Sequence, residues 1–194
     1  MILASIKPYY YYLIAEEKKK IEVRKTALKD LPQDIVFYMS KDEKSFAKIP
    51  KEFQEKYRKH FGKVGLKVLC DKIDEYAFHD GLTEFNSMGL PSRIYGSYLI
   101  FADEYKSMCL SYDEVKNYGK GKTLYGWHIS DLKIYAKPKN LSEFYRPCSY
   151  SGICYSCNRF RPNGTPNDSP NDFCDGTITR PTQSYMRVEE LDEK

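Results

Sequence analysis

The sequence predicts an α+β protein, built as a small mixed β-barrel with helices packed on its outside. Strand-like segments occur both before and after the helical segments, several of them are short, and no regular alternation of strand and helix is maintained. A doubly wound parallel sheet would require that alternation. With 194 residues and 41% hydrophobic side chains, the chain can close a single core.

The N-terminal segment is expected to form a strand, a helix and a charged strand. Residues 1–7 have the apolar character of a strand, and Pro8 suits the first position of a helix because its missing N–H costs nothing there. This helix is expected to end near Glu17, and a second strand is expected over residues 21–26.

The next segment is expected to contain two strands separated by a helix. Residues 34–40 (DIVFYMS) predict a largely buried strand, and a helix is expected to begin at Pro50. Its apolar positions have helical spacing, at Phe53, Tyr57 and Phe61. Apolar residues then alternate over residues 63–73, which predicts a half-buried strand with Cys70 in the core.

The C-terminal half is less regular. Residues 75–97 show no clear period and predict a long loop or insertion. Ser111 and Glu114 have the spacing of a capping box, which predicts a helix ending near residue 119. Residues 126–135 predict a strand pair or one bent strand, and Ser142 is expected to cap one further helical turn.

Composition limits the class of protein. The chain has 31 Lys and Arg against 27 Asp and Glu, a net charge of +4 that is compatible with nucleic-acid binding without requiring it. Its 18 tyrosines suit core edges and equally the stacking of bases. No apolar run approaches the roughly 20 residues of a membrane span, and no secretory signal is recognisable, so we expect a cytoplasmic protein.

Four cysteines near the C-terminus predict a closed structural zinc site. Cys148, Cys154, Cys157 and Cys174 have the spacing C-x5-C-x2-C-x16-C, in which the central pair can present two thiolates to one tetrahedral ion. The segment between the last two is rich in Pro, Asn, Gly and Asp, so a metal would supply stability that a core cannot. Two disulfides, or four unrelated thiols, are the alternatives. The other two cysteines are expected to be buried thiols, Cys70 and Cys109.

The stretch KKKIEVRK, residues 18–25, carries an unusual amount of charge for a strand. If it is extended, Ile21 and Val23 share one face. The opposite face then holds Lys20, Glu22 and Arg24. One interpretation is a solvated strand face held by cross-strand ion pairs; the other is a face that contacts a ligand.

The residues from Glu17 to Arg24, EKKKIEVR, resemble the G-x-K-x-x-E-x-R signature of the ASCH family, whose domains have a PUA-like β-barrel. Glu17 stands at the glycine position of the signature, which leaves the shape of that turn open. The segments VGLKVLCDKI and YGWHISDLKIYAKPKNLSEFY also resemble this family. The resemblance covers residues 1–147 and 179–190, so that residues 148–178 form an inserted zinc loop.

The resemblance implies a ligand cleft in the barrel, lined by Lys19, Glu22 and Arg24, and RNA or a modified nucleoside as the ligand. Trp127 is a candidate for stacking on a base. His128 is a candidate ligand contact, with a hydrogen-bonded histidine at the barrel edge as the plainer alternative. The two other histidines, His60 and His79, are expected at the surface.

Some ASCH-family proteins are similar to amidohydrolases that deacetylate N4-acetylcytidine with a lysine, a threonine and a glutamate. Lys19 matches the lysine position, and Glu22 stands at the threonine position, where it could activate water as a general base. Glu104 is the candidate second carboxylate. Three functions are therefore carried forward: an RNA or nucleoside binding module, a small hydrolase with Zn2+ in a purely structural role, and a zinc-stabilised adaptor that binds another protein.

Overall fold

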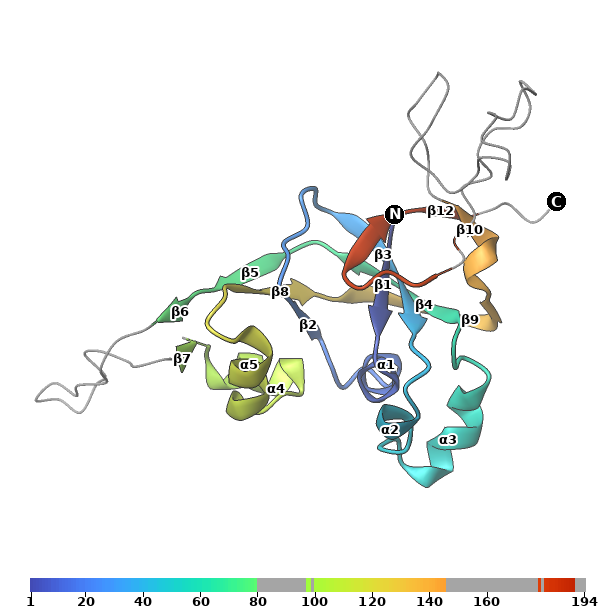
Figure 1. The fold of residues 1–194 in the computed structure, drawn as a ribbon, viewed down its shortest axis with the longest axis horizontal. Coiled ribbons are helices and arrows are strands. Elements are labelled where there is room, and N and C mark those ends of the chain that lie inside the picture. The colour runs from blue at the N-terminus through green and yellow to red at the C-terminus, as the bar shows by residue number, and fades with distance from the viewer. Residues whose placement is uncertain (80–96, 99, 146–177, 179, 191–194) are drawn as a thin grey trace, which may run out of the picture.

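The computed structural model describes residues 1–79, 97–98, 100–145, 178 and 180–190, and these residues form a mixed α+β architecture (Figure 1). The predicted α+β class is therefore confirmed. The four cysteines predicted to bind zinc lie outside the described residues, at Cys148, Cys154, Cys157 and Cys174.

Five strands form the larger sheet, in the order β11-β1-β3-β4-β9. β1 pairs in parallel with β3, and the other pairs are antiparallel. The strands are β1 (Ile2–Ile6), β3 (Gln33–Met39), β4 (Val64–Cys70), β9 (Ser130–Lys139) and β11 (Tyr185–Arg187). The pairing of β11 with β1 brings the C-terminal segment beside the N-terminus (Figure 1).

The smaller sheet has the order β2-β8-β5 and is antiparallel throughout. Its strands are β2 (Ile21–Arg24), β5 (Ile73–Tyr76) and β8 (Leu124–His128). β4 of the larger sheet is followed directly by β5 of the smaller sheet. Likewise, β8 of the smaller sheet is followed directly by β9 of the larger sheet. The strand pair or bent strand predicted over residues 126–135 is thereby confirmed as β8 and β9.

Five α-helices and two short strand pairs complete the described part. α2 and α3 lie on one side of α1, and α4 and α5 lie on the other (Figure 1). The helices are α1 (Pro8–Ala15), α2 (Glu43–Phe46), α3 (Lys51–Arg58), α4 (Ala102–Met108), α5 (Tyr112–Gly119) and the 3₁₀ helix η1 (Leu141–Glu143). The strand pairs are β6 (Phe78–His79) with β7 (Ser97–Tyr98), and β10 (Phe144–Tyr145) with β12 (Glu189–Glu190). None of the helices described is long and apolar enough to cross a membrane.

Of two predicted helix starts, the structure confirms one and corrects the other. The capping box of α5 is confirmed, because Glu114 N donates to Ser111 Oγ and Ser111 N donates to the Glu114 carboxylate at 2.8 Å. The prediction that Ser142 caps a helical turn is wrong. η1 begins after Asn140, because the Glu143 carboxylate accepts a hydrogen bond from Asn140 N at 2.6 Å.

The main core lies between α1, α3 and one face of the larger sheet. Cys70 is fully buried in it, as predicted, whereas Cys109 at the end of α4 is half-buried. The prediction that His60 lies at the surface is wrong: it is 2% exposed. Its Nδ1 lies 2.8 Å from the hydroxyl of Tyr11, and this hydrogen bond allows a polar ring to be buried.

Candidate functional site

The turn between α1 and β2 determines where the charged residues begin. Lys18 N donates to Leu13 O at 2.8 Å and Glu17 N donates to Ile14 O at 2.9 Å, which is the pattern of a Schellman motif. The motif requires a left-handed residue, and Glu17 adopts φ 55°. Glu17 thus takes the conformation that the glycine of the signature would adopt most easily.

The two faces of β2 have different environments. Ile21 and Val23 pack beneath α4 and α5 in a separate apolar cluster, as their alternation predicts. Glu22 lies opposite Trp127 of β8, so this side of the strand faces the main core. The prediction that Lys20 shares this side is wrong. Lys20 precedes the strand and forms an exposed ion pair with Glu17.

Lys19, Glu22 and Arg24 form one buried charged cluster, which we call the β2 cluster. Glu22 holds both cations: Lys19 Nζ lies 3.5 Å from Glu22 Oε2, and Arg24 Nε lies 3.0 Å from Glu22 Oε1. The three residues are 2%, 7% and 8% exposed. Their charges are therefore largely removed from water. Interactions between charges are stronger in the protein interior than in water.

Backbone carbonyls from two other elements accept hydrogen bonds from the two cations. Lys19 Nζ donates to Met108 O, at the end of α4, at 2.5 Å. Arg24 Nη2 donates to Ser5 O, in β1, at 2.7 Å. The β2 cluster therefore connects the smaller sheet to α4 and to the larger sheet.

The β2 cluster is not balanced. It contains two cations and one carboxylate, and Arg24 Nε is a buried donor without a hydrogen bond. This nitrogen is close enough to Glu22 for an ion pair, but the contact does not have hydrogen-bond geometry. A buried donor left unsatisfied costs about 1–3 kcal/mol. The arrangement is thus suited to an additional acceptor or negative charge.

Two tyrosines from different helices lie beside the β2 cluster. The Tyr10 ring centroid, on α1, is 5.3 Å from Lys19 Nζ, and the Tyr10 hydroxyl lies 3.5 Å from the carboxylate of Glu114 on α5. Burial, then the charges of Glu114 and Glu22, raise the pKa of Tyr10 to about 12. Tyr118 of α5 remains 40% exposed, with its pKa raised by burial and affected by the charges of Arg24 and Glu22.

Burial is also the largest influence on Lys19. It lowers the pKa of the Lys19 ammonium, and the neighbouring carboxylate of Glu22 opposes that shift. A lysine with a lowered pKa beside a carboxylate is a pair able to exchange protons with a substrate.

The side chains of Trp127 and His128 lie on opposite faces of β8. Trp127 is fully buried in the main core, where its Nε1 donates to Thr26 O at 3.1 Å and its ring lies 5.5 Å from the Arg24 guanidinium. In this position it packs as a core residue and offers no exposed face to a base. His128 points to the opposite side of β8, since neighbouring strand residues alternate, and pairs with Asp74 at 2.6 Å.

Glu104 lies outside the β2 cluster. Its carboxylate accepts hydrogen bonds from Phe101 N at 2.9 Å and from the Tyr76 hydroxyl at 3.1 Å, so it caps α4. The structure thus brings together Lys19, Glu22 and Arg24 but leaves Glu104 in a structural role. The tyrosines that border the cluster were not predicted, because Tyr10 and Tyr118 carry no signal of it in the sequence.

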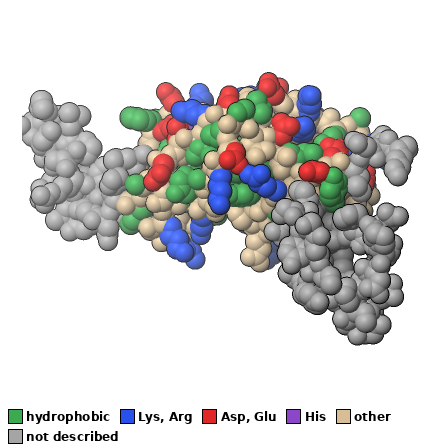
Figure 2. Space-filling model, turned by 90° about the horizontal axis from the view of Figure 1, so that it is seen from above, with side chains coloured by type: hydrophobic (Ala, Val, Ile, Leu, Met, Phe, Trp, Pro, Cys, Tyr) green, Lys and Arg blue, Asp and Glu red, His purple; other side chains and the backbone are tan. Residues whose placement is uncertain are grey.

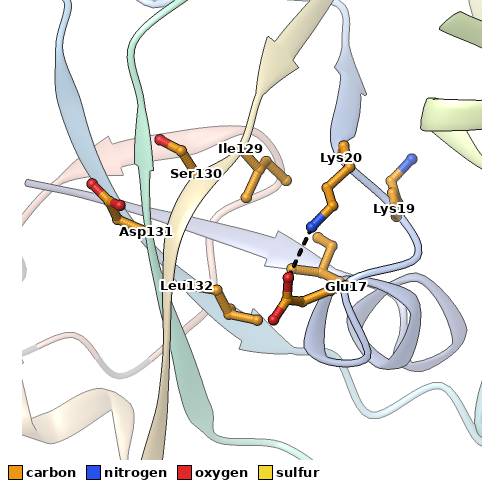
Figure 3. A pocket seen from close by; sticks show the side chains of 8 residues that line it. Glu17, Lys19, Lys20, Ile129, Ser130, Asp131 and Leu132 are labelled. Carbon is orange, nitrogen blue, oxygen red and sulfur yellow. Dashed lines mark hydrogen bonds and ion pairs between the residues drawn. The ribbon is translucent and has the colours of Figure 1, made fainter.

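A shallow pocket of about 120 Å³ lies on the other side of the α1–β2 turn (Figure 3). Glu17, Lys20 and Asp131 contribute its charged groups. Lys19 borders the pocket, but its side chain points away from Lys20 and Glu17 (Figure 3). Of the β2 cluster only Lys19 lines it; neither Glu22 nor Arg24 does.

No metal site accompanies these residues. Within the described ranges, no group of three or more His, Cys, Asp and Glu side chains is placed to hold an ion.

Comparisons with known proteins find similarity at the level of structure. No protein-family model and no curated protein matches the sequence. The crystal structure of ASCH from Zymomonas mobilis is similar, with 17% identity over 72% of this chain and 73% of that chain and a TM-score of 0.43. Crystal structures of two mutants of ZmASCH from the same organism have TM-scores of 0.45 and 0.44, with 15% and 16% identity over 72% of this chain and 75% and 73% of theirs. None of these similarities is close enough to assign a function.

Proposed function

We propose that this protein binds RNA or a modified nucleoside at the β2 cluster, within an ASCH-like, PUA-like barrel. The observation that carries the proposal is the excess positive charge of Lys19 and Arg24 over Glu22, together with the unsatisfied Arg24 N–H. A phosphate or a base carbonyl would supply the missing acceptor, and Glu22 would accept from an exocyclic amine.

The ligand would approach from the part of the β2 cluster that solvent reaches. The side chains of Glu22 and Arg24 each retain 10% exposure, so the cluster has an edge that solvent reaches. Tyr118 is 40% exposed, and the charges of Arg24 and Glu22 act on its hydroxyl, which places it near that edge. It is better placed than Trp127 to stack on a base, an interaction worth about 1–3 kcal/mol.

The test is a direct binding measurement with RNA oligonucleotides and a panel of modified nucleosides, N4-acetylcytidine included. Lys19→Met should abolish binding, because it removes the buried ammonium while keeping a similar side-chain length. Lys20→Met is the matched control, since that neighbouring lysine is exposed and points elsewhere. Equal binding by both variants would disprove the proposal.

Hydrolysis is the second candidate, and the lowered pKa of Lys19 beside Glu22 favours it. In an amide hydrolysis, Glu22 would accept a proton from water as the oxygen attacks the acetyl carbonyl. The Lys19 ammonium would donate a proton to the departing exocyclic amine, giving acetate and the free base. Chromatography of N4-acetylcytidine incubated with the protein tests this. Product formation lost in Lys19→Met would make it an enzyme, and binding without product would leave a binding module.

We also propose that Cys148, Cys154, Cys157 and Cys174 hold a structural Zn2+. The support is their spacing, and four thiolate ligands would leave no open position for chemistry. Elemental analysis of purified protein should find about one equivalent of zinc, lost in Cys154→Ser/Cys157→Ser. Zinc-free protein with four reactive thiols would contradict the site.

A further inference from the structure

The net charge of the chain resides in one helical segment. Residues 41–63, which contain α2 and α3, carry eight Lys or Arg against four Asp or Glu. This excess equals the net charge of +4 of the whole chain, so the remaining residues are balanced. On the face seen from above, acidic and basic side chains are interspersed (Figure 2).

Most cations of this segment are free to meet a partner. Five of them, all exposed, make no ion pair with a described acidic side chain: Lys41, Lys44, Lys48, Lys51 and Lys59. Two of the four acidic residues are already engaged, because Asp42 accepts from Ser45 N at the start of α2 and Glu43 pairs with Arg58.

The two helices of the segment contact each other directly. Arg58 of α3 makes two 2.9 Å contacts with Glu43 of α2, and its guanidinium lies 4.9 Å and 4.7 Å from the rings of Phe46 and Phe61. These contacts join α2 to α3, so that the exposed lysines of both helices lie close to the same junction. Their combined field reaches the interior, where burial and the charges of Lys59, Lys56 and Lys63 lower the pKa of His60.

A membrane is a poor match for this surface. The apolar side of α3 is turned inward, with Tyr57 fully buried, and binding in a lipid interface requires an exposed apolar face. The large exposed apolar side chains of the described residues all lie outside residues 41–63. Charge without apolar area fits a phosphate backbone, which cations neutralise one by one.

The surface lies one helix away from the β2 cluster. On one side, α1 contacts α2 and α3 through Tyr9 N and Ser45 Oγ at 3.1 Å and through the rings of Tyr12 and Phe53. On the other side, Tyr10 of α1 lies against Lys19. The separation is therefore about the 10–12 Å diameter of a helix, which a strand of several nucleotides can span.

We infer that the α2–α3 surface, residues 41–63, binds the phosphodiester backbone of a nucleic acid whose base occupies the β2 cluster. This rests on the proposed function and deepens it, because it makes the ligand a polymer. The α2–α3 surface contacts phosphates and supplies affinity, and the base is recognised at the β2 cluster.

The test compares two triple variants of the full chain in binding a 16-nucleotide single-stranded RNA at several salt concentrations. Lys44→Gln/Lys48→Gln/Lys59→Gln removes three cations from the surface. Lys29→Gln/Lys133→Gln/Lys137→Gln removes three exposed cations from other parts of the described chain. The slope of log K against log salt should fall by about 2 in the first variant, at roughly 0.7 per lost phosphate contact, and stay unchanged in the second.

Further arms separate the inference from the proposed function. Single-stranded DNA should show the same loss of slope, because its backbone carries the same phosphates. Nucleoside binding should be equal in both triple variants. If nucleoside binding holds while the RNA slope is the same in both variants, the surface inference is wrong. If wild-type protein binds anionic vesicles more tightly than RNA, the surface is a membrane contact and the inference is also wrong.

Discussion

The ammonium of Lys19 lies 3.5 Å from the carboxylate of Glu22, with their side chains 1% and 10% exposed. The same carboxylate also holds Arg24 at 3.0 Å. Glu22 is thus the shared counter-charge of two buried cations. Removing Glu22 should therefore change the stability of the protein differently from removing one of the cations.

Glu22→Gln should destabilise the protein more than Lys19→Met. The first change leaves two buried cations without a counter-charge, and breaking a buried pair in this way costs about 3–5 kcal/mol. The second change leaves Glu22 paired with Arg24 and loses mainly the hydrogen bond to Met108 O, so its cost should be about 1–3 kcal/mol. Urea unfolding monitored by Trp127 fluorescence gives both values, and the opposite order would disprove the role of Glu22.

Glu17→Gly should stabilise the protein by about 1 kcal/mol. Glu17 has φ 55°, and the left-handed conformation costs roughly 1–2 kcal/mol for a residue with a Cβ. The lost ion pair with Lys20 is exposed and worth less than about 1 kcal/mol. Glu17→Ala is the control, because it removes the ion pair without relieving the backbone. Equal midpoints of chemical unfolding for the two variants would contradict the prediction.

Stability should fall between pH 6.5 and pH 4 because of His60. Burial, followed by the charges of Lys59, Lys56 and Lys63, lowers its pKa from 6.5 to about 4. In this window the unfolded chain binds a proton that the folded protein does not, so the free energy of unfolding falls as the pH falls. The loss by pH 4.5 should be on the order of 2 kcal/mol.

His60→Gln isolates this contribution. Its unfolding free energy should decline less between pH 7 and pH 4.5 than that of the wild type, because other titrating groups are common to both proteins. Parallel declines in the two proteins would show that the imidazole does not stay neutral in the fold.

Gly65→Ala should cost about 1–3 kcal/mol through overpacking. A Cβ at this position of β4 would overlap His60 Nδ1 and the Tyr11 hydroxyl. In a Tyr11→Phe background the cost should be smaller, since one of the two clashing atoms is gone. Thermal unfolding of the four proteins measures the difference, and full additivity of the two changes would exclude the clash.

Local pattern predicted several elements correctly. The alternation of Ile21 and Val23 predicted the inward apolar side of β2. The Ser111–Glu114 pair predicted the start of α5. These predictions succeed because side-chain periodicity and capping depend on residues a few positions apart.

The sequence failed where long-range packing decides. Strand alternation grouped Lys20 with Glu22 and Arg24, whereas the turn after α1 places Lys19 beside them, the lysine that the signature resemblance implied. The sequence offered Trp127 as a candidate for base stacking, whereas burial in the main core makes that ring a core residue. No local pattern could indicate that Tyr10 and Tyr118, more than a hundred residues apart, border the same cluster.

The sequence by itself determined the α+β class, the charged strand and its apolar side, and the positions of four cysteines with the spacing of a metal site. The tertiary structure decided what surrounds these charges, because α4 and β1 must pack against β2 before Lys19 and Arg24 can bond to Met108 O and Ser5 O. It also decided that their charge is buried, since water is excluded by residues distant in the sequence. Because the cluster is buried, water does not screen its excess of one positive charge. That excess is the physical basis of the proposed function.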